Sequence, residues 1–279
     1  MILQSVLVLG GVGLVFAILI ALANRKLKVW EDPRIDAVAG MLPNANCGAC
    51  GLPGCRAFAE EAVAGKVTPS QCNVLDAPGL AAVATYLGVD AGAVDKKVAR
   101  LRCAGGSDVA VQRAEYRGYP TCAAAAAVGG GGKGCAWGCL GLADCQVACD
   151  FGAITMNEVG LPVVDIDKCT ACGDCVDACP KDLFTILPLS RHLFVQCRNL
   201  LAGDEVLAQC RVACTACGRC VQDAARGLIS VESGVAVIAD DLALLEDPRA
   251  ISRCPTDSIV WLEGAQFATV PPLERSMSA

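Results

Sequence analysis

Cysteine is the residue type whose number and spacing in this sequence indicate chemistry. Of the 279 residues 20 are cysteines, and many of them stand in closely spaced groups, several of the C-x2-C kind. Disulfide-rich secreted domains are normally short, whereas thiolates grouped in this way along a longer chain are typical of metal ligands. We therefore expect the cysteines to bind metal, with iron–sulfur clusters as the main interpretation and zinc as the alternative.

The most specific pattern is a run of four cysteines followed by a proline. It reads C-x2-C-x2-C-x3-C-P, as in bacterial two-cluster ferredoxins, where the fourth cysteine binds the other cluster. A partner group must then lie upstream in the chain. The sequence predicts two crossed [4Fe–4S] sets, namely Cys169, Cys172 and Cys175 with Cys149, and Cys135, Cys139 and Cys145 with Cys179.

Two further groups predict one cluster each. The glycine-rich segment NCGACGLPGC and one distant cysteine give the set Cys47, Cys50, Cys55 and Cys72. Near the C-terminus, a C-x2-C-x2-C run has Ala224 where its fourth cysteine would fall, and a lone Cys-Pro follows later. The crossed pattern predicts that this late cysteine completes the set Cys214, Cys217, Cys220 and Cys254. We interpret this half as a two-cluster ferredoxin that has kept one centre.

Four cysteines remain after these assignments, which is the number that a fifth cluster needs. Two of them end apolar strand patterns, VARLRC and LFVQC, and neighbouring strands would present both thiolates at one edge. The predicted fifth set is Cys103, Cys122, Cys197 and Cys210. Unligated structural cysteines are the alternative, and Cys210 also lies close enough in sequence to compete for the site at Cys214. The sequence thus predicts five clusters, and at least three.

Short elements are expected between the cysteine groups. Helical patterns cover Arg56–Gly65 and Leu80–Leu87. Strand patterns cover Ala153–Met156 and Val163–Ile166, and the glycine and proline between them predict a compact hairpin.

Other motifs in the sequence do not assign further chemistry. The segment GGGGKG at 129–134 lacks the first glycine and the final Ser or Thr of a phosphate-binding loop, so we expect a flexible hinge there. The single histidine, His192, is expected to form hydrogen bonds rather than to bind metal. No catalytic triad, pair of catalytic carboxylates or dinucleotide-binding motif is recognisable, so the sequence predicts electron transfer without a substrate site.

The N-terminal segment has the properties of a membrane anchor. No charged residue occurs between Ile2 and Asn24, and a helix of this length spans about 33 Å, which matches a bilayer core of about 30 Å. Arg25, Lys26 and Lys28 follow directly, which predicts a single-pass protein in the inner (cytoplasmic) membrane with its soluble part in the cytoplasm. A cleaved signal peptide is disfavoured because the positive charges lie after the apolar run.

The net charge excludes one class of partner. The formal charge is −6, and thiolate-bound clusters would add further negative charge. Nucleic-acid binding needs clustered Lys and Arg, which this sequence lacks, so nucleic acid is not an expected partner.

Taken together, these motifs resemble the B subunit of the Rnf complex, the ion-translocating ferredoxin:NAD oxidoreductase of bacterial and some archaeal membranes. The resemblance is carried by the anchor, by NCGACGLPGC, by CAWGCLGLADCQVACDFGAITM and by GLPVVDIDKCTACGDCVDACP. It implies a subunit that accepts electrons from soluble ferredoxin and passes them to partner subunits that bind flavin and NAD. A membrane-tethered polyferredoxin that donates electrons to another reductase, or that keeps a redox sensor reduced, is the alternative.

The expected fold class is α+β, with a transmembrane helix, a small [4Fe–4S] domain and tandem ferredoxin-like domains. The predicted segments are an anchor at 1–28, an N-terminal cluster domain at 35–90, a connecting segment at 91–134, a two-cluster ferredoxin domain at 135–188, a one-cluster ferredoxin-like domain at 189–263 and a tail at 264–279.

Overall fold

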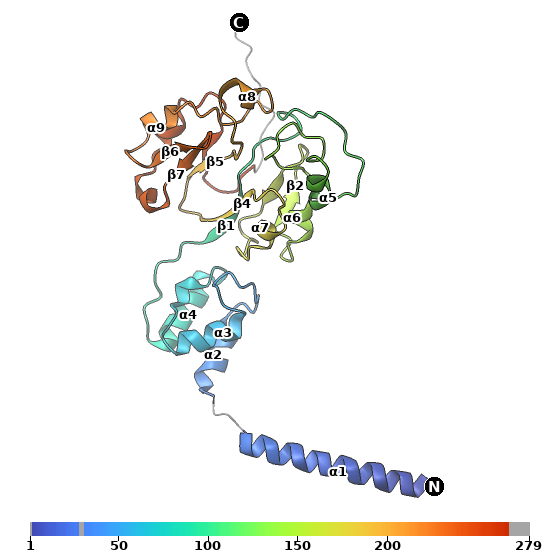
Figure 1. Ribbon diagram of the computed structural model, residues 1–279. Coiled ribbons are helices and arrows are strands. Elements are labelled where there is room, and N and C mark those ends of the chain that lie inside the picture. The colour runs from blue at the N-terminus through green and yellow to red at the C-terminus, as the bar shows by residue number, and fades with distance from the viewer. Residues whose placement is uncertain (1, 28–30, 268–279) are drawn as a thin grey trace.

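The structure of the chain is a computed structural model that describes residues 2–27 and 31–267 (Figure 1). Helix α1, Ile2–Leu27, carries the apolar N-terminal run and ends in basic residues. Among the described residues, Val6–Lys26 is the one segment that is long and apolar enough to cross a membrane, and none of it is buried by the rest of the chain. Lys28 and most of the predicted tail at 264–279 lie outside the described residues.

The next unit is helical. Helices α2 (Pro33–Met41), α3 (Cys55–Val63) and α4 (Ala77–Leu87), with the 3-10 turn η1 (Pro69–Gln71), pack around a small apolar core formed by Val38, Phe58 and Val83. The sequence patterns located α3 and α4 to within a few residues. Helix α4 ends at Gly88, whose left-handed backbone (φ 67°) is the usual helix stop for glycine.

Two small antiparallel sheets support the middle of the chain. Strand β1 (Lys97–Leu101) pairs with β4 (Phe184–Pro188), and β2 (Ile154–Met156) pairs with β3 (Pro162–Val164) as the expected hairpin. Each sheet has two strands, and its buried side chains pack with cysteines in one core cluster. The short helices α5 (Cys122–Ala127), α6 (Asp144–Val147) and α7 (Asp174–Asp177) complete this unit.

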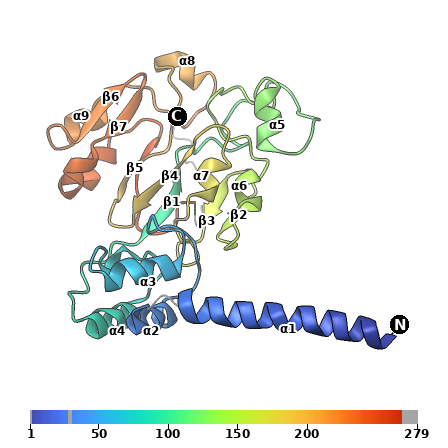
Figure 2. The ribbon, with the colours of Figure 1, turned by 60° about the horizontal axis from the view of Figure 1, so that its bottom comes forward.

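The last described unit repeats this construction. Strand β5 (Leu193–Val195) pairs with β8 (Ile259–Trp261), and β6 (Ile229–Glu232) pairs with β7 (Val235–Ile238). Helices α8 (Gly203–Leu207) and α9 (Arg219–Asp223) and the 3-10 turns η2 (Asp240–Leu245) and η3 (Pro248–Ile251) connect the strands. Figures 1 and 2 place this orange unit beside the green and yellow one in both views.

The backbone joins these two units directly. The amide of Ala104 donates to the carbonyl of Gln196 at 3.0 Å, and the amide of Arg211 donates to the carbonyl of Val109 at 3.1 Å. Strands β1 and β5 belong to different sheets, contrary to the expectation that they would share an edge. The loops that follow them meet instead, so Cys103 and Cys197 still line one cavity.

The glycine run at 129–134 is not a free hinge. Gly132 accepts hydrogen bonds from the amides of Arg113 and Ala114, at 2.7 and 3.2 Å. A Cβ on Gly132 would collide with the Ala114 carbonyl, so glycine is required for this close approach. The expectation of a flexible hinge was wrong because the absence of side chains allows tight packing here.

A buried ion pair ties η2 to strand β5. Arg191 Nε donates to Glu246 Oε1 at 2.5 Å, and the two side chains are 8% and 4% exposed. The second carboxylate oxygen accepts from the amides of His192 and Leu193 at 2.8 and 2.9 Å. The His192 ring nitrogen Nδ1 lies 2.7 Å from the Leu262 carbonyl, in agreement with the hydrogen-bonding role expected for this residue.

Replacing Glu246 with alanine should therefore lower the free energy of unfolding by about 3 kcal/mol. It removes the buried partner of Arg191, which keeps only the exposed Asp240, and it leaves the amides of His192 and Leu193 without an acceptor. Glu115→Ala is the control, since Glu115 is 73% exposed in its pair with Arg117 and should change stability by less than about 1 kcal/mol. Urea denaturation followed by circular dichroism measures both. Equal effects of the two changes would contradict the structural role given to Glu246.

Candidate metal centres

The 20 cysteines gather around five cavities, with four cysteines at each. The cavities are alike in size, each with about 310 to 360 Å³ of empty space, part of which is open to solvent. In order of the first cysteine, they are site 1 (Cys47, Cys50, Cys55, Cys72), site 2 (Cys103, Cys135, Cys197, Cys210), site 3 (Cys122, Cys139, Cys145, Cys179), site 4 (Cys149, Cys169, Cys172, Cys175) and site 5 (Cys214, Cys217, Cys220, Cys254). All twenty are free thiols rather than disulfides.

Site 1 is built by the loop between α2 and α3 and by the segment after η1. Its wall includes the apolar side chains of Leu42 and Phe58. The side-chain oxygen of Asn46 accepts from the amide of Cys55 at 2.9 Å, which fixes the loop at the start of α3. A Cβ on Gly54 would lie 2.9 Å from that oxygen, so glycine is needed at this position.

Sites 3 and 4 share the β2–β3 unit, and each half lends a cysteine to the other site. Cys179 follows α7 but lines site 3, and Cys149 follows α6 but lines site 4. The amide of Ala153 donates to the Cys149 sulfur at 3.4 Å. This geometry is the crossing that two-cluster ferredoxins use.

One seven-residue loop recurs in sites 3, 4 and 5. It runs from Cys139, Cys169 or Cys214 to the cysteine six residues later, and its third and fifth residues adopt left-handed backbone conformations: Gly141 and Ala143, Ala171 and Gly173, and Ala216 and Gly218. An alanine at positive φ costs roughly 1–2 kcal/mol, and such strain concentrates at functional sites. The middle residue of the loop is a cysteine in sites 4 and 5, but it is Leu142 in site 3.

This leucine explains why the sequence-based grouping differs from the structure. Leu142 has no sulfur, and Cys122 of α5 lines site 3 with the two outer cysteines of the loop. Both carboxylate oxygens of Asp144 accept from the start of α5, from the amides of Cys122 at 2.9 Å and Ala123 at 3.0 Å. The predicted placement of Cys135 in this set is therefore corrected. The three loops differ in sequence at this point, which shows that one ligand of site 3 must come from outside its loop.

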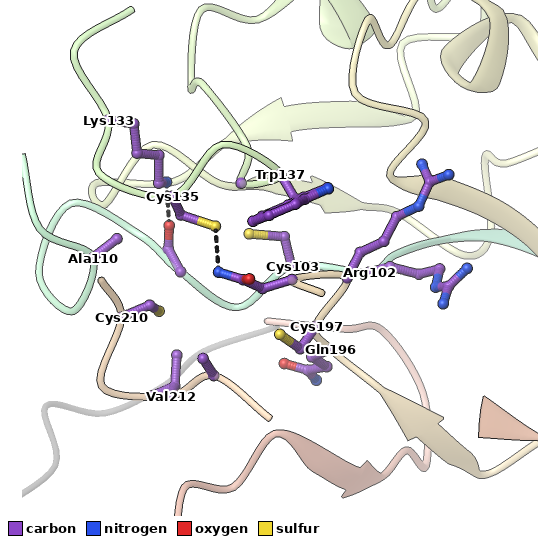
Figure 3. Close-up of a pocket in the computed structure, with 15 residues that line it drawn as sticks. Arg102, Cys103, Ala110, Lys133, Cys135, Trp137, Gln196, Cys197, Cys210 and Val212 are labelled. Atoms are coloured by element: carbon purple, nitrogen blue, oxygen red, sulfur yellow. Dashed lines mark hydrogen bonds between the residues drawn. The ribbon is translucent and has the colours of Figure 1, made fainter. Parts of the chain in front are cut away.

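Cys135 lies in site 2 instead, as Figure 3 shows. Asn199 holds it there, since its side-chain amide donates to the Cys135 sulfur at 3.3 Å. The other three sulfurs come from the loop after β1, the loop after β5 and the segment after α8, and all four line one cavity with Trp137. Site 2 thus joins the unit that contains β1 to the unit that contains β5, which no local spacing in the sequence reveals.

Gly105 makes room for this arrangement. A Cβ at that position would lie 3.1 Å from the Cys210 sulfur and 3.6 Å from the Cys103 sulfur. The side chain of Lys133 also lines site 2, and its Nζ donates to the carbonyls of Gly105 and Cys139. No local motif marks Asn199, Asp144 or Lys133, because each acts through contacts that only the fold creates.

Site 5 contains the cysteine that is most accessible to solvent. Cys217 is the one exposed cysteine among the twenty, all of which the structure describes. Burial alone would raise the pKa of Cys254, but amide donors from Ile259 and neighbouring residues and the Ser258 hydroxyl outweigh it, so its pKa is lowered. Hydrogen bonds to sulfur of this kind stabilise the thiolate form that binds metal.

Burial dominates at other cysteines. It raises the pKa of Cys139, Cys145 and Cys175 to about 12, and the neighbouring thiolates add to the effect. Such thiols keep their protons at neutral pH unless a cation replaces them, and metal binding supplies that cation. The donor set therefore fits a group that brings its own positive charge.

The quartets surround spaces rather than single points. Within the described residues, no three His, Cys, Asp or Glu side chains converge closely enough to hold one metal ion. A zinc ion needs sulfurs about 2.3 Å from its centre, whereas a cluster of several irons has ligands spread around it. The geometry and the donors at all five sites fit a [4Fe–4S] cluster.

Comparison with protein families gives two matches. A family model for a putative Fe-S cluster matches residues 42–74, which contain the four cysteines of site 1. A model described as a 4Fe-4S dicluster domain matches residues 134–183, which contain site 4 and three of the site 3 cysteines. These matches support iron–sulfur clusters at the two places.

Curated relatives match most of the chain. The B subunit of the Na(+)-translocating ferredoxin:NAD(+) oxidoreductase complex of Acetobacterium woodii is 43% identical over 258 residues, which cover 92% of this chain and 77% of the relative. The proton-translocating counterpart of Clostridium ljungdahlii is 36% identical, with 89% and 88% covered. The B subunit of the ion-translocating oxidoreductase complex of Methanosarcina acetivorans is 34% identical, with 92% and 97% covered. The chain therefore belongs to the Rnf family of B subunits of ion-translocating oxidoreductase complexes.

Proposed function

We propose that the chain carries five [4Fe–4S] clusters, one at each of sites 1 to 5, and conducts electrons within a membrane-bound oxidoreductase complex. The observation that carries this proposal is the division of all 20 cysteines into five quartets around cavities of similar volume. The two family matches support the clusters at site 1 and at sites 3 and 4. When bound, the clusters supply one-electron redox chemistry.

The partners follow from the names of the relatives. Two of them belong to ferredoxin:NAD(+) oxidoreductase complexes. We propose that this chain accepts electrons from soluble ferredoxin and passes them to other subunits of such a complex, where NAD is reduced. The chain by itself is an electron carrier, and the complex is the enzyme.

The membrane topology follows from charge. Arg25 and Lys26 lie at the C-terminal end of α1, and the positive-inside rule then keeps the remainder of the chain in the cytoplasm. We propose that α1 crosses the cytoplasmic membrane once, and that the helical unit with site 1 lies closest to the membrane partners. The segments proposed from the sequence, 1–28, 35–90, 135–188, 189–263 and 264–279, then correspond to anchor, site 1 domain, two ferredoxin-like units and tail. The segment 91–134, expected as a connector, instead contributes β1 and α5 to the first of these two units.

The protein groups have three tasks in this mechanism. The cysteines hold the clusters, the amides that donate to sulfur stabilise negative charge, and the apolar walls exclude water. Trp137 lines site 2, and Phe58 lines site 1. An electron that enters at one site leaves from another, and no bond in the chain forms or breaks.

Anaerobically purified protein should contain about 20 irons and about 20 acid-labile sulfides per chain, because each quartet holds about four of each. Colorimetric iron and sulfide assays measure this. Zinc without labile sulfide would contradict the proposal.

The structural grouping of Cys135 predicts a difference between two double variants. Cys135→Ala with Cys197→Ala alters one site, so about four irons should be lost, the same as in either single variant. Cys135→Ala with Cys145→Ala alters two sites, so about eight should be lost. The reverse result would restore the grouping expected from the sequence spacing.

Replacing Cys172 with serine should remove the signal of one cluster and stop ferredoxin-dependent NAD reduction by the complex, because site 4 loses a ligand. The conservative change Ser230→Ala on an exposed strand position is the control and should leave turnover unchanged. Full turnover of the Cys172→Ser complex would exclude site 4 from the electron path.

A further inference from the structure

Lys133 is the one cation of the glycine-rich segment 129–134, and its charge lies between two of the cysteine sites. Its Nζ donates to the carbonyl of Cys139 at 2.6 Å and to the carbonyl of Gly105. Cys139 lines site 3, and Gly105 lines site 2. Figure 3 shows the lysine reaching down beside Cys135, with a hydrogen bond to a carbonyl drawn.

The backbone of Cys139 connects the same two sites. Its amide donates to the Cys103 sulfur of site 2 at 3.4 Å, while its own sulfur belongs to site 3. Lys133 lines site 2, and its Nζ contacts the carbonyl of the site 3 residue Cys139. One ammonium group therefore lies beside both sites.

The charge of Lys133 is not neutralised by a carboxylate. Within the described part of the chain Lys133 forms no ion pair, and both of its hydrogen-bond partners are neutral carbonyls. The two arginines that line site 2 are placed differently. The guanidinium of Arg102 points away from the four sulfurs in Figure 3, and that of Arg198 donates to the carbonyls of Lys181 and Asp182.

We propose that Lys133 is a shared counter-charge for the clusters of sites 2 and 3, which raises the reduction potential of both and leaves the other three unaffected. A reduced cluster carries one more negative charge than an oxidised one, and a nearby cation in a poorly solvated site stabilises the added charge. The electron that reduces the cluster of site 2 or site 3 comes from a neighbouring reduced cluster, which is oxidised in the same step. No proton needs to accompany the electron. The inference rests on the proposed presence of clusters at both sites.

Lys133→Gln tests it, because glutamine keeps a hydrogen-bond donor but removes the charge. The full-length variant and the wild-type protein are titrated in detergent, and electron paramagnetic resonance follows the reduction of each cluster. In the variant, two of the cluster signals should appear at lower potential than in the wild type. Lys133→Arg retains the charge and should restore both towards the wild-type values. Lys133→Met is a second neutral variant and should shift the same two components.

Lys168 provides a matched control. It directly precedes Cys169 of site 4, but its side chain is 63% exposed and pairs with Asp165 at 3.2 Å. Solvent and the carboxylate screen its charge, so Lys168→Gln should shift no component.

Removal of site 2 identifies the components. In a Cys135→Ala, Cys197→Ala background, Lys133→Gln should shift one component rather than two.

If the neutral variants keep their full iron content and no component moves, or if all components move equally, the inference is overturned. If the wild-type protein contains no iron and sulfide, the proposed function fails instead, and the two failures are distinguished by the metal assay. Loss of iron from both neutral variants and from Lys133→Arg would also overturn the inference, because it would make the role of Lys133 structural.

Discussion

Each quartet of cysteine sulfurs has to be buried and yet hold negative charge when metal is bound, and the rest of the structure depends on how the chain resolves this conflict. Desolvation disfavours the thiolate, which is why burial raises the pKa of Cys175 to about 12. The chain offsets this with amide donors to sulfur, as at Cys149, and with left-handed residues that turn the loops around the cavities. Regular secondary structure is correspondingly short in the described cluster-binding units, where each sheet has only two strands.

The same conflict explains where the core lies. Two of the three apolar core clusters contain buried cysteines among their members, and the third has cysteines packed against it. Because aromatic residues make up only 4% of the chain, few large side chains are present to fill these spaces. Metal binding would then contribute to the free energy of folding as well as to function.

The sequence predicted sites 1, 4 and 5 as groups because three cysteines of each follow a short spacing. The crossed ferredoxin pattern, or a single distant cysteine in site 1, supplied the fourth. The sequence predicted the β2–β3 hairpin and helices α3 and α4 for similar local reasons. The sequence-based grouping was wrong at sites 2 and 3, where it exchanged Cys122 and Cys135. Asp144 positions Cys122 and Asn199 positions Cys135 through hydrogen bonds that span 22 and 64 residues of sequence. Leu142 was the available signal, since it occupies the place of the middle cysteine in a loop that occurs three times.

The central claim is that iron occupies all five quartets in the grouping that the structure gives. An anomalous difference map recorded at the iron absorption edge from crystals of the anaerobic protein would test it most directly. Five separate iron peaks are expected, with Cys122, Cys139, Cys145 and Cys179 around one and Cys103, Cys135, Cys197 and Cys210 around another. Fewer peaks, disulfide bonds between these cysteines, or Cys135 bound at the peak of Cys145 would contradict it.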